Sequence, residues 1–278
     1  MVTTVAKPSG QTFIPREHGA TAMLLTPFFA AAILLRRFYW TEFVALIAVA
    51  CAFAIKDPLV VMGRQRFVWK QEREETSVAR RSALIEFLAL ASSGLVLILV
   101  RDWRPFLPLF LGAATFTALA VTLNVKNRQR SEWFQTASAV ALTATSLMAC
   151  LAAENMIPKW CWFLWMLSAM QAAAGIFVVH ARLDARIAAR KGQAPPSGNR
   201  RAAFACQIVL IAAAVYFAWT DHLLITAALI VAAAGYLFDL MRQRSPASLQ
   251  LPLKDVGRQA LGLSIVYTLL IIAGLWNL

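Results

Sequence analysis

The chain has 278 residues, of which 60% are hydrophobic and only 15% are charged, and its mean hydropathy is +0.63. A soluble domain carries roughly 45–50% apolar and about 25% charged residues, so this composition excludes a single water-soluble domain and indicates a membrane protein. The net charge of +13 comes from short basic tracts between apolar runs. That distribution favours contact with anionic lipid on the cytoplasmic side over binding of nucleic acid.

Nine mainly apolar runs follow one another along the chain, each near the length of about 20 residues that a spanning helix needs. They cover residues 20–35, 43–61, 83–100, 106–125, 134–152, 160–179, 202–219, 223–240 and 256–276. We therefore predict an all-α polytopic bundle of about nine transmembrane helices, which forms one domain over residues 1–278. Residues 1–19 form a cytoplasmic N-terminal segment, and residues 62–82 and 180–201 form the longer cytoplasmic loops.

The positions of the basic residues predict the orientation of this bundle. With the N-terminus in the cytoplasm, the extracytoplasmic connections contain few of the 27 Lys and Arg residues: only Arg36, Arg37, Arg101, Arg104 and Lys159. Because cytoplasmic loops are enriched in Lys and Arg, this asymmetry supports both the odd helix count and a cytoplasmic N-terminus. The C-terminus is then extracytoplasmic.

Polar and ionisable side chains gather at the predicted cytoplasmic ends of the helices. Arginine and lysine outnumber the acids there, and Arg binds phosphate or carboxylate through paired hydrogen bonds. We expect these residues to bind an anionic head group; the alternative is that the basic side chains only meet lipid phosphates. The candidate ligand-binding residues are Arg16, Glu17, His18, Lys56, Asp57, Arg64, Glu86, Asn124, Lys126, Arg128, His180, Arg182 and Asp184.

Some of these candidates have more specific interpretations. Glu17 is favoured at the start of a helix by the helix dipole, and Glu86 lies inside a predicted span, where a carboxylate needs a partner. His180 and Asp184 are four residues apart and therefore share one helical face. The expected role of His180 is that of a hydrogen-bonded structural histidine, and the alternative is a proton carrier or ligand. The four cysteines all lie in apolar segments, without metal-ligand spacing, and are expected to be small buried hydrophobes rather than a disulfide framework.

Two resemblances add to this interpretation. The stretch Pro-Arg-Glu-His-Gly-Ala-Thr-Ala-Met-Leu-Leu-Thr-Pro, residues 15–27, resembles the opening signature of the YwiC-like family of bacterial membrane proteins. The stretch Pro-Leu-Lys-Asp-Val-Gly, residues 252–257, is similar to the ending of that family. This resemblance implies a protein of the bacterial cytoplasmic (inner) membrane but no particular reaction.

The layout also resembles, more distantly, the UbiA superfamily of intramembrane prenyltransferases, which has nine helices and a site open to the cytoplasm. In that superfamily an Arg and a Pro open the first helix, an Asp-rich motif follows the second, a Lys-Arg pair follows the fourth and a second Asp motif ends the sixth. The corresponding positions here are Arg16 with Pro27, Lys56-Asp57-Pro58 with Arg64, Lys126 with Arg128, and the stretch from His180 to Asp184.

The chain departs from the superfamily in its carboxylates. Magnesium in such sites is held by carboxylates and substrate phosphates, but only Asp57 and Asp184 remain in the corresponding stretches, beside arginines. No cofactor is therefore predicted, and the two isolated carboxylates argue against magnesium.

Three hypotheses for function follow. The first is a UbiA-like membrane protein that binds a lipid or isoprenoid ligand with an anionic or quinone-type head group, extending to a metal-independent transferase. The second is a small-solute transporter, and the third is a non-catalytic accessory factor of a membrane complex. Membrane lipid is an expected partner in all three, nucleic acid in none, and the oligomeric state stays open.

Overall fold

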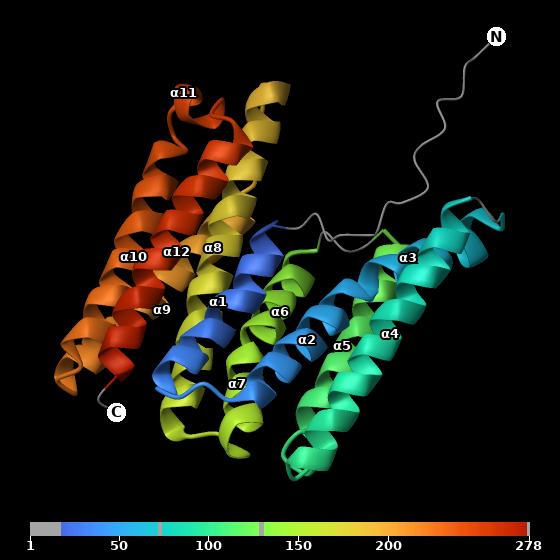
Figure 1. Ribbon diagram of the computed structural model, residues 1–278. Helices are drawn as coiled ribbons and strands as arrows, with labels where there is room; N and C mark the ends of the chain where they lie inside the picture. Colours follow the sequence, from blue (N-terminus) through green and yellow to red (C-terminus); the bar gives the residue numbers. More distant parts are fainter. Residues whose placement is uncertain (1–17, 72–73, 128–130, 277–278) are drawn as a thin grey trace. The chain divides into compact units, whose positions relative to one another are not determined.

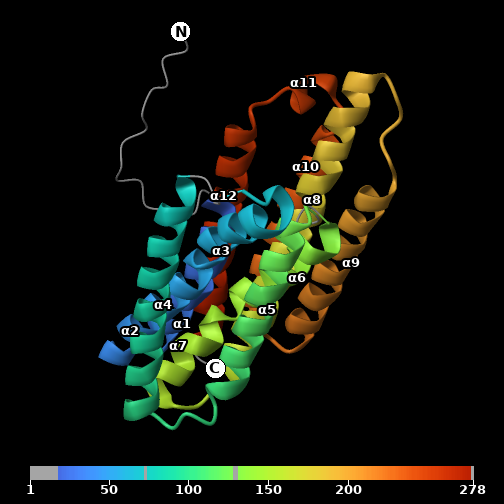
Figure 2. The same ribbon diagram turned by 90° about the vertical axis from the view of Figure 1, so that its right-hand side faces the viewer.

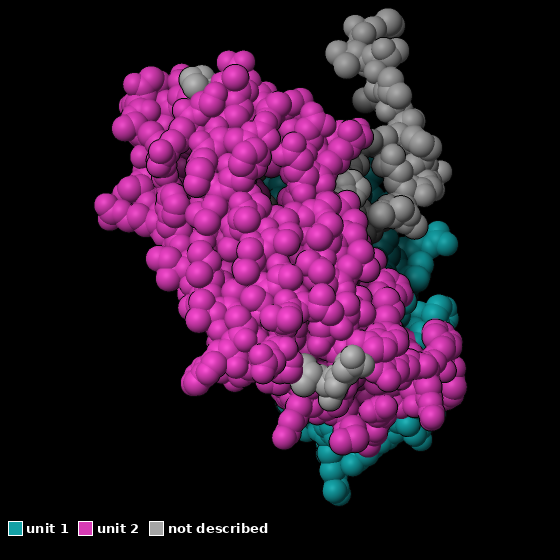
Figure 3. All heavy atoms as spheres, turned by 90° about the vertical axis from the view of Figure 1, so that its left-hand side faces the viewer, with its two compact units in different colours: residues 1–17, 43–129 teal, residues 18–42, 130–278 magenta. Residues whose placement is uncertain are grey.

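The computed structural model describes residues 18–71, 74–127 and 131–276, and every regular element within them is a helix (Figure 1). The chain divides into two compact units. Unit 1 comprises residues 1–17 and 43–129, and unit 2 comprises residues 18–42 and 130–278 (Figure 3).

Unit 2 is a helical bundle whose most buried element is the short helix α7 (Thr145–Glu154). Its elements are α1 (His18–Leu34), α6 (Glu132–Thr143), α7 (Thr145–Glu154), α8 (Lys159–Lys191), α9 (Gly198–Trp219), α10 (Leu223–Arg242), α11 (Pro246–Leu249) and α12 (Leu253–Leu275). The long helix α8 packs against α6, α9 and α10, and α1 packs against α6 and α7. Every residue of α7 from Thr145 to Ala153 is buried, so this short helix forms the core of the unit.

Unit 1 holds the remaining helices. They are α2 (Trp40–Ala54, whose first three residues belong to unit 2), α3 (Lys56–Gly63), the π-helix η1 (Arg64–Trp69), α4 (Glu75–Val100) and α5 (Leu107–Val125). Helix α3 packs against both α4 and α5. A Cβ atom on Gly63 would lie 2.8 Å from Cγ2 of Val125, so the absence of a side chain at Gly63 permits the close approach of α3 and α5.

The described residues contain eight helical segments that are long and apolar enough to cross a membrane, together with the shorter apolar helix Gly19–Leu34. These nine segments match the nine predicted spans in order. Two of them are made of more than one element, because α2, α3 and η1 run on from Trp40 to Trp69 and α6 and α7 run on from Glu132 to Glu154. The prediction of an all-α polytopic bundle is confirmed.

The main difference from the predicted spans lies in α8. This helix extends 12 residues beyond the predicted end at residue 179, to Lys191, and α9 already begins at Gly198. The stretch 180–201 is therefore mostly helical rather than a loop. Its sequence is rich in Ala and Arg, which both favour helix, while the arginines lower the hydropathy, and Gly192 ends the helix with a φ of 61°.

Large apolar side chains point outward along the spanning helices. Ile208, Val215 and Trp219 of α9 and Leu88 and Leu99 of α4 are all exposed, with Leu99 75% exposed. A soluble protein rarely exposes contiguous apolar surface of this kind, whereas lipid tails solvate it without cost.

Candidate functional site

Three of the predicted site residues, Arg16, Glu17 and Arg128, lie outside the described residues. His18 is the first residue of α1, and its side chain is likewise not described. The other candidates fall into two groups, one in each unit.

The arginine at the junction of α3 and η1 is the best-defined candidate of unit 1. Nη2 of Arg64 donates a hydrogen bond to the backbone oxygen of Asn124 (2.8 Å) and another to Oδ1 of Asn127 (3.1 Å). Both acceptors lie where α5 ends, and Asn127 has a left-handed φ of 55° that turns the chain there. The close approach of Gly63 to Val125 explains why Arg64 reaches these two atoms.

The positive charge of Arg64 is held by neutral oxygens. The carbonyl end of α5 carries a partial negative charge, which favours a cation, but no carboxylate among the described residues pairs with this guanidinium. Its Nε atom is buried and has no hydrogen-bond partner in that part of the chain. Arg64 therefore keeps both donor capacity and net charge.

The π-helix positions this arginine. Gln65 is buried and accepts a hydrogen bond from the hydroxyl of Thr76 in α4, whereas Arg66, Phe67 and Trp69 are exposed. A π-helical turn shifts side chains around the helix axis relative to an α-helix, and such turns are frequent at functional sites. Here it fixes Gln65 inward while Arg64 faces the end of α5.

Further charges of unit 1 lie on the elements that flank Arg64. Nζ of Lys56 lies 3.7 Å from Oδ1 of Asp57 and 5.3 Å from the ring centroid of Phe53. Lys126 is exposed at the end of α5. The side-chain amide of Asn124 donates to the backbone oxygen of Ala120 (3.1 Å), and the backbone oxygen of Asn124 accepts from the backbone N–H of Asn127 (3.1 Å) as well as from Arg64.

Glu86 lies inside the span formed by α4, as predicted. Its Oε2 atom is buried and without a hydrogen-bond partner among the described residues, and its carboxyl group interacts electrostatically with that of Asp57. Asp57 and Arg64 are seven residues apart and therefore lie on the same face of α3 and η1, about 10 Å apart along the axis. The sequence did not indicate that Glu86 and Asp57 interact.

In unit 2, His180 and Asp184 both contact amide side chains of neighbouring helices. Nε2 of His180 lies 2.9 Å from Oε1 of Gln135 in α6. The side-chain amide nitrogen of Asn199 in α9 donates to Oδ2 of Asp184 (2.7 Å) and to Oε1 of Glu132 in α6 (2.7 Å). Sequence reasoning missed Gln135, Glu132 and Asn199, because their pairing depends on contacts between helices that are distant in sequence.

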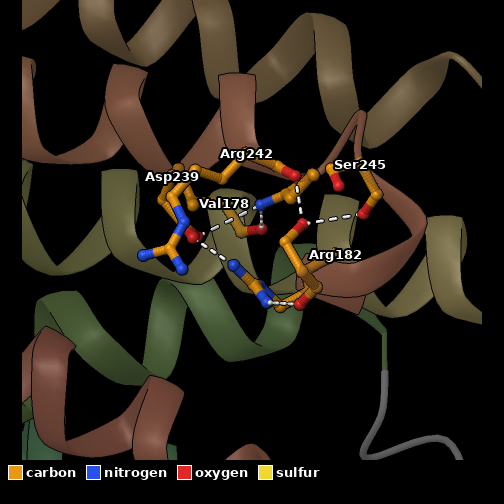
Figure 4. Close-up of polar contacts among 7 residues, drawn as sticks. Val178, Arg182, Asp239, Arg242 and Ser245 are labelled. Atoms are coloured by element: carbon orange, nitrogen blue, oxygen red, sulfur yellow. Dashed lines mark hydrogen bonds and ion pairs between the residues drawn. The ribbon is translucent and has the colours of Figure 1, made fainter. Parts of the chain in front are cut away.

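Arg182 lies on the opposite side of α8, in a polar network (Figure 4), and its buried Nε atom, like that of Arg64, has no hydrogen-bond partner among the described residues. Its side chain is only 1% exposed and forms an ion pair with Asp239 of α10, while its Nη1 donates to the backbone oxygen of Ser248 in α11 (3.0 Å). Nε2 of Gln243 joins Oδ2 of Asp239 (3.2 Å) to the backbone oxygen of Val178 (3.2 Å). Figure 2 shows α11 and the C-terminal part of α8 at the same end of the unit.

Asp239 was the signal that sequence reasoning overlooked. It is an isolated carboxylate in the apolar helix α10, and an ionisable group in such a helix is costly unless it is paired. The same reasoning applies to Glu42, which is 2% exposed and accepts a hydrogen bond from the backbone N–H of Tyr39 (3.0 Å). That bond caps the start of α2, so it gives Glu42 a structural role.

The described residues do not fit the magnesium pair that the UbiA resemblance implies. Asp57 is paired with Lys56, and Asp184 is hydrogen-bonded to Asn199. Within the described ranges, no group of three or more His, Cys, Asp or Glu side chains is arranged to hold a metal ion.

The apolar helical segments and their outward-facing Leu, Ile and Trp side chains define a multi-pass helical membrane protein. A model of the family described as YwiC-like protein matches residues 14–153, just over half of the chain, and the chain belongs to that family. Neither a curated protein nor a solved structure matches the chain. The match includes the opening block and the unit 1 candidates but does not reach His180, Arg182, Asp184 or residues 252–257.

Proposed function

We propose that this protein is an inner-membrane protein that binds a lipid or isoprenoid ligand through an anionic head group, and that Arg64 is the main contact of that head group. One observation carries the proposal: a half-buried guanidinium is fixed at the end of α5 by two neutral oxygens, and no carboxylate of the described residues pairs with it.

The chemistry of Arg64 suits a phosphate or carboxylate. Only Nη2 is committed to α5, and the planar guanidinium presents further donors in the geometry that these anions accept. Because a half-buried charge is screened less than an exposed one, an anion gains more there than at the surface lysines. Lys126, exposed at the end of the same helix, adds positive charge.

The apolar part of the ligand has a surface to occupy next to this site. Ile85 and Leu88 are exposed on α4, the helix that packs against α3. A tail lying along α4 would exchange lipid contacts for protein contacts at little cost, while the head group supplies the selectivity. The charge asymmetry of the loops supports a cytoplasmic location for the head group.

The test is binding of defined probes to the full chain purified in detergent, measured by native mass spectrometry. Farnesyl diphosphate and phosphatidylglycerol represent the two sources of an anionic amphiphile, and farnesol is the uncharged control. The site variant is Arg64→Gln, and the matched control is Arg66→Gln, an exposed arginine of the same π-helix.

We expect at least one anionic probe to bind the wild type and the Arg66→Gln variant, and about tenfold weaker binding to Arg64→Gln. The probe that binds more tightly identifies the source of the head group. Equal losses in the two variants would indicate unspecific attraction, and equal binding of farnesol would remove the role of the charge; either result overturns the proposal.

A further inference from the structure

Two cysteines meet at the turn between α7 and α8 in unit 2. The Sγ atoms of Cys150, in α7, and Cys161, in the first turn of α8, are 2.7 Å apart. Both side chains are 0% exposed. Sγ of Cys161 also donates to the backbone oxygen of Ser146 (3.3 Å). The expectation of buried cysteines holds for these two, but their juxtaposition was not predicted.

The local sequence explains why the two sulfurs meet. Asn155 adopts a left-handed φ of 60° and ends α7, and Pro158 directly precedes α8, so the chain reverses over residues 155–158. Cys150 lies about one turn before the end of α7, and Cys161 lies within one turn of the start of α8. The small buried residues Ala149 and Ala153 allow the two helices to approach.

We propose that Cys150 and Cys161 form an intramolecular disulfide bond that closes the α7–α8 turn. The Sγ atoms need to move by about 0.7 Å to reach the disulfide bond length of about 2.05 Å. The loop charges place this turn on the extracytoplasmic side, where disulfides form and persist. The proposal does not depend on the function proposed for Arg64.

The oxidant of these two thiols is a disulfide of another protein on the extracytoplasmic side of the membrane. Exchange through a mixed disulfide replaces the two S–H bonds of this chain by one S–S bond, and the disulfide of the oxidant becomes two thiols, which take up the two electrons and the two protons. Because Cys150 and Cys161 are fully buried in the folded chain, the exchange occurs before α7 is packed.

The other two cysteines provide an internal reference. Cys51 of α2 and Cys206 of α9 are only half-buried. Cells that produce the full chain are treated with N-ethylmaleimide before lysis, and the protein is denatured in the same reagent and weighed by mass spectrometry. We expect two adducts without reduction and four after reduction of all four cysteines. Four adducts without reduction would overturn the proposal.

Peptide mapping should then find residues 150 and 161 in one cross-linked pair. In cells that lack their extracytoplasmic thiol oxidase we expect four adducts, and persistence of the cross-link there would overturn the assignment of the oxidant. Production in these oxidase-deficient cells should lower the Tm of the wild type and of the Cys51→Ser/Cys206→Ser variant by about 5–10 °C, and it should leave the Tm of Cys150→Ser/Cys161→Ser unchanged. An equal shift in both double variants would contradict a stabilising bond.

Discussion

Two arginines of this protein have similar sequence contexts and different surroundings. Arg182 in unit 2 is 1% exposed, is paired with the carboxylate of Asp239 and donates to a backbone oxygen of α11. Arg64 in unit 1 is half-buried and contacts only neutral oxygens at the end of α5. Both follow apolar runs and both were candidates for binding an anion. The comparison teaches that the partner of a membrane arginine, rather than its position, separates a structural charge from one available to a ligand.

Removal of Arg182 should have the largest effect on stability. The variant Arg182→Ala leaves Asp239 partly buried without its partner, and loss of one member of such a pair costs about 3–5 kcal/mol. Thermal unfolding in detergent should show a decrease in Tm of roughly 10 °C, with Arg190→Ala on the exposed end of the same helix as the control.

The double variant Arg182→Met/Asp239→Leu sharpens this result, because it removes both charges and should recover most of the lost stability. It should also retain the binding of the anionic probe. If the folded double variant loses that binding, Arg182 belongs to the ligand site and the contrast with Arg64 fails.

A side chain at residue 63 should disturb the site without touching its charge. In the variant Gly63→Ala the new Cβ meets Cγ2 of Val125 at 2.8 Å, and we expect a cost of about 1–3 kcal/mol together with weaker binding of the probe. Adding Val125→Ala should restore both properties. If Val125→Ala does not restore binding, the close approach of α3 and α5 does not determine the position of Arg64.

Asn199 holds two carboxylates of unit 2 together, and its removal should have a smaller effect. The variant Asn199→Ala deprives Asp184 and Glu132 of their shared donor, at a cost of about 1–2 kcal/mol measured by unfolding. Probe binding should remain at the wild-type level, because Arg64 belongs to the other unit. The exposed neighbour Gln193 is a suitable control position, where Gln193→Ala should change neither property.

The smallest stability effect is expected for Arg64 itself. Because its partners are neutral and the side chain is half-buried, Arg64→Gln should change the free energy of unfolding by less than about 1 kcal/mol. The same variant should bind the anionic probe about tenfold more weakly. A loss of stability as large as that of Arg182→Ala would show that both arginines are structural.

Hydropathy was sufficient to predict the spans and their order, because the bilayer demands long apolar runs whatever the tertiary contacts are. It could not predict the end of α8, where Ala and Arg form a helix that is not apolar. Helical spacing correctly placed His180 and Asp184 on one face. The partners Asp239, Asn199 and Gln135 come from other helices, and one sequence contains no information on which helices become neighbours.

Helix α8 is longer than a membrane-spanning helix needs to be, and its last residues are basic. Its 33 residues extend about 50 Å, whereas the hydrocarbon core is about 30 Å thick, and an average tilt of about 20° shortens the helix along the membrane normal only slightly. We therefore expect its last turns to extend past the hydrocarbon core on the cytoplasmic side. Arg190 and Lys191, which are exposed at this end, should then reach the head-group layer or the water beyond it, where both lipid phosphates and soluble anions can meet them.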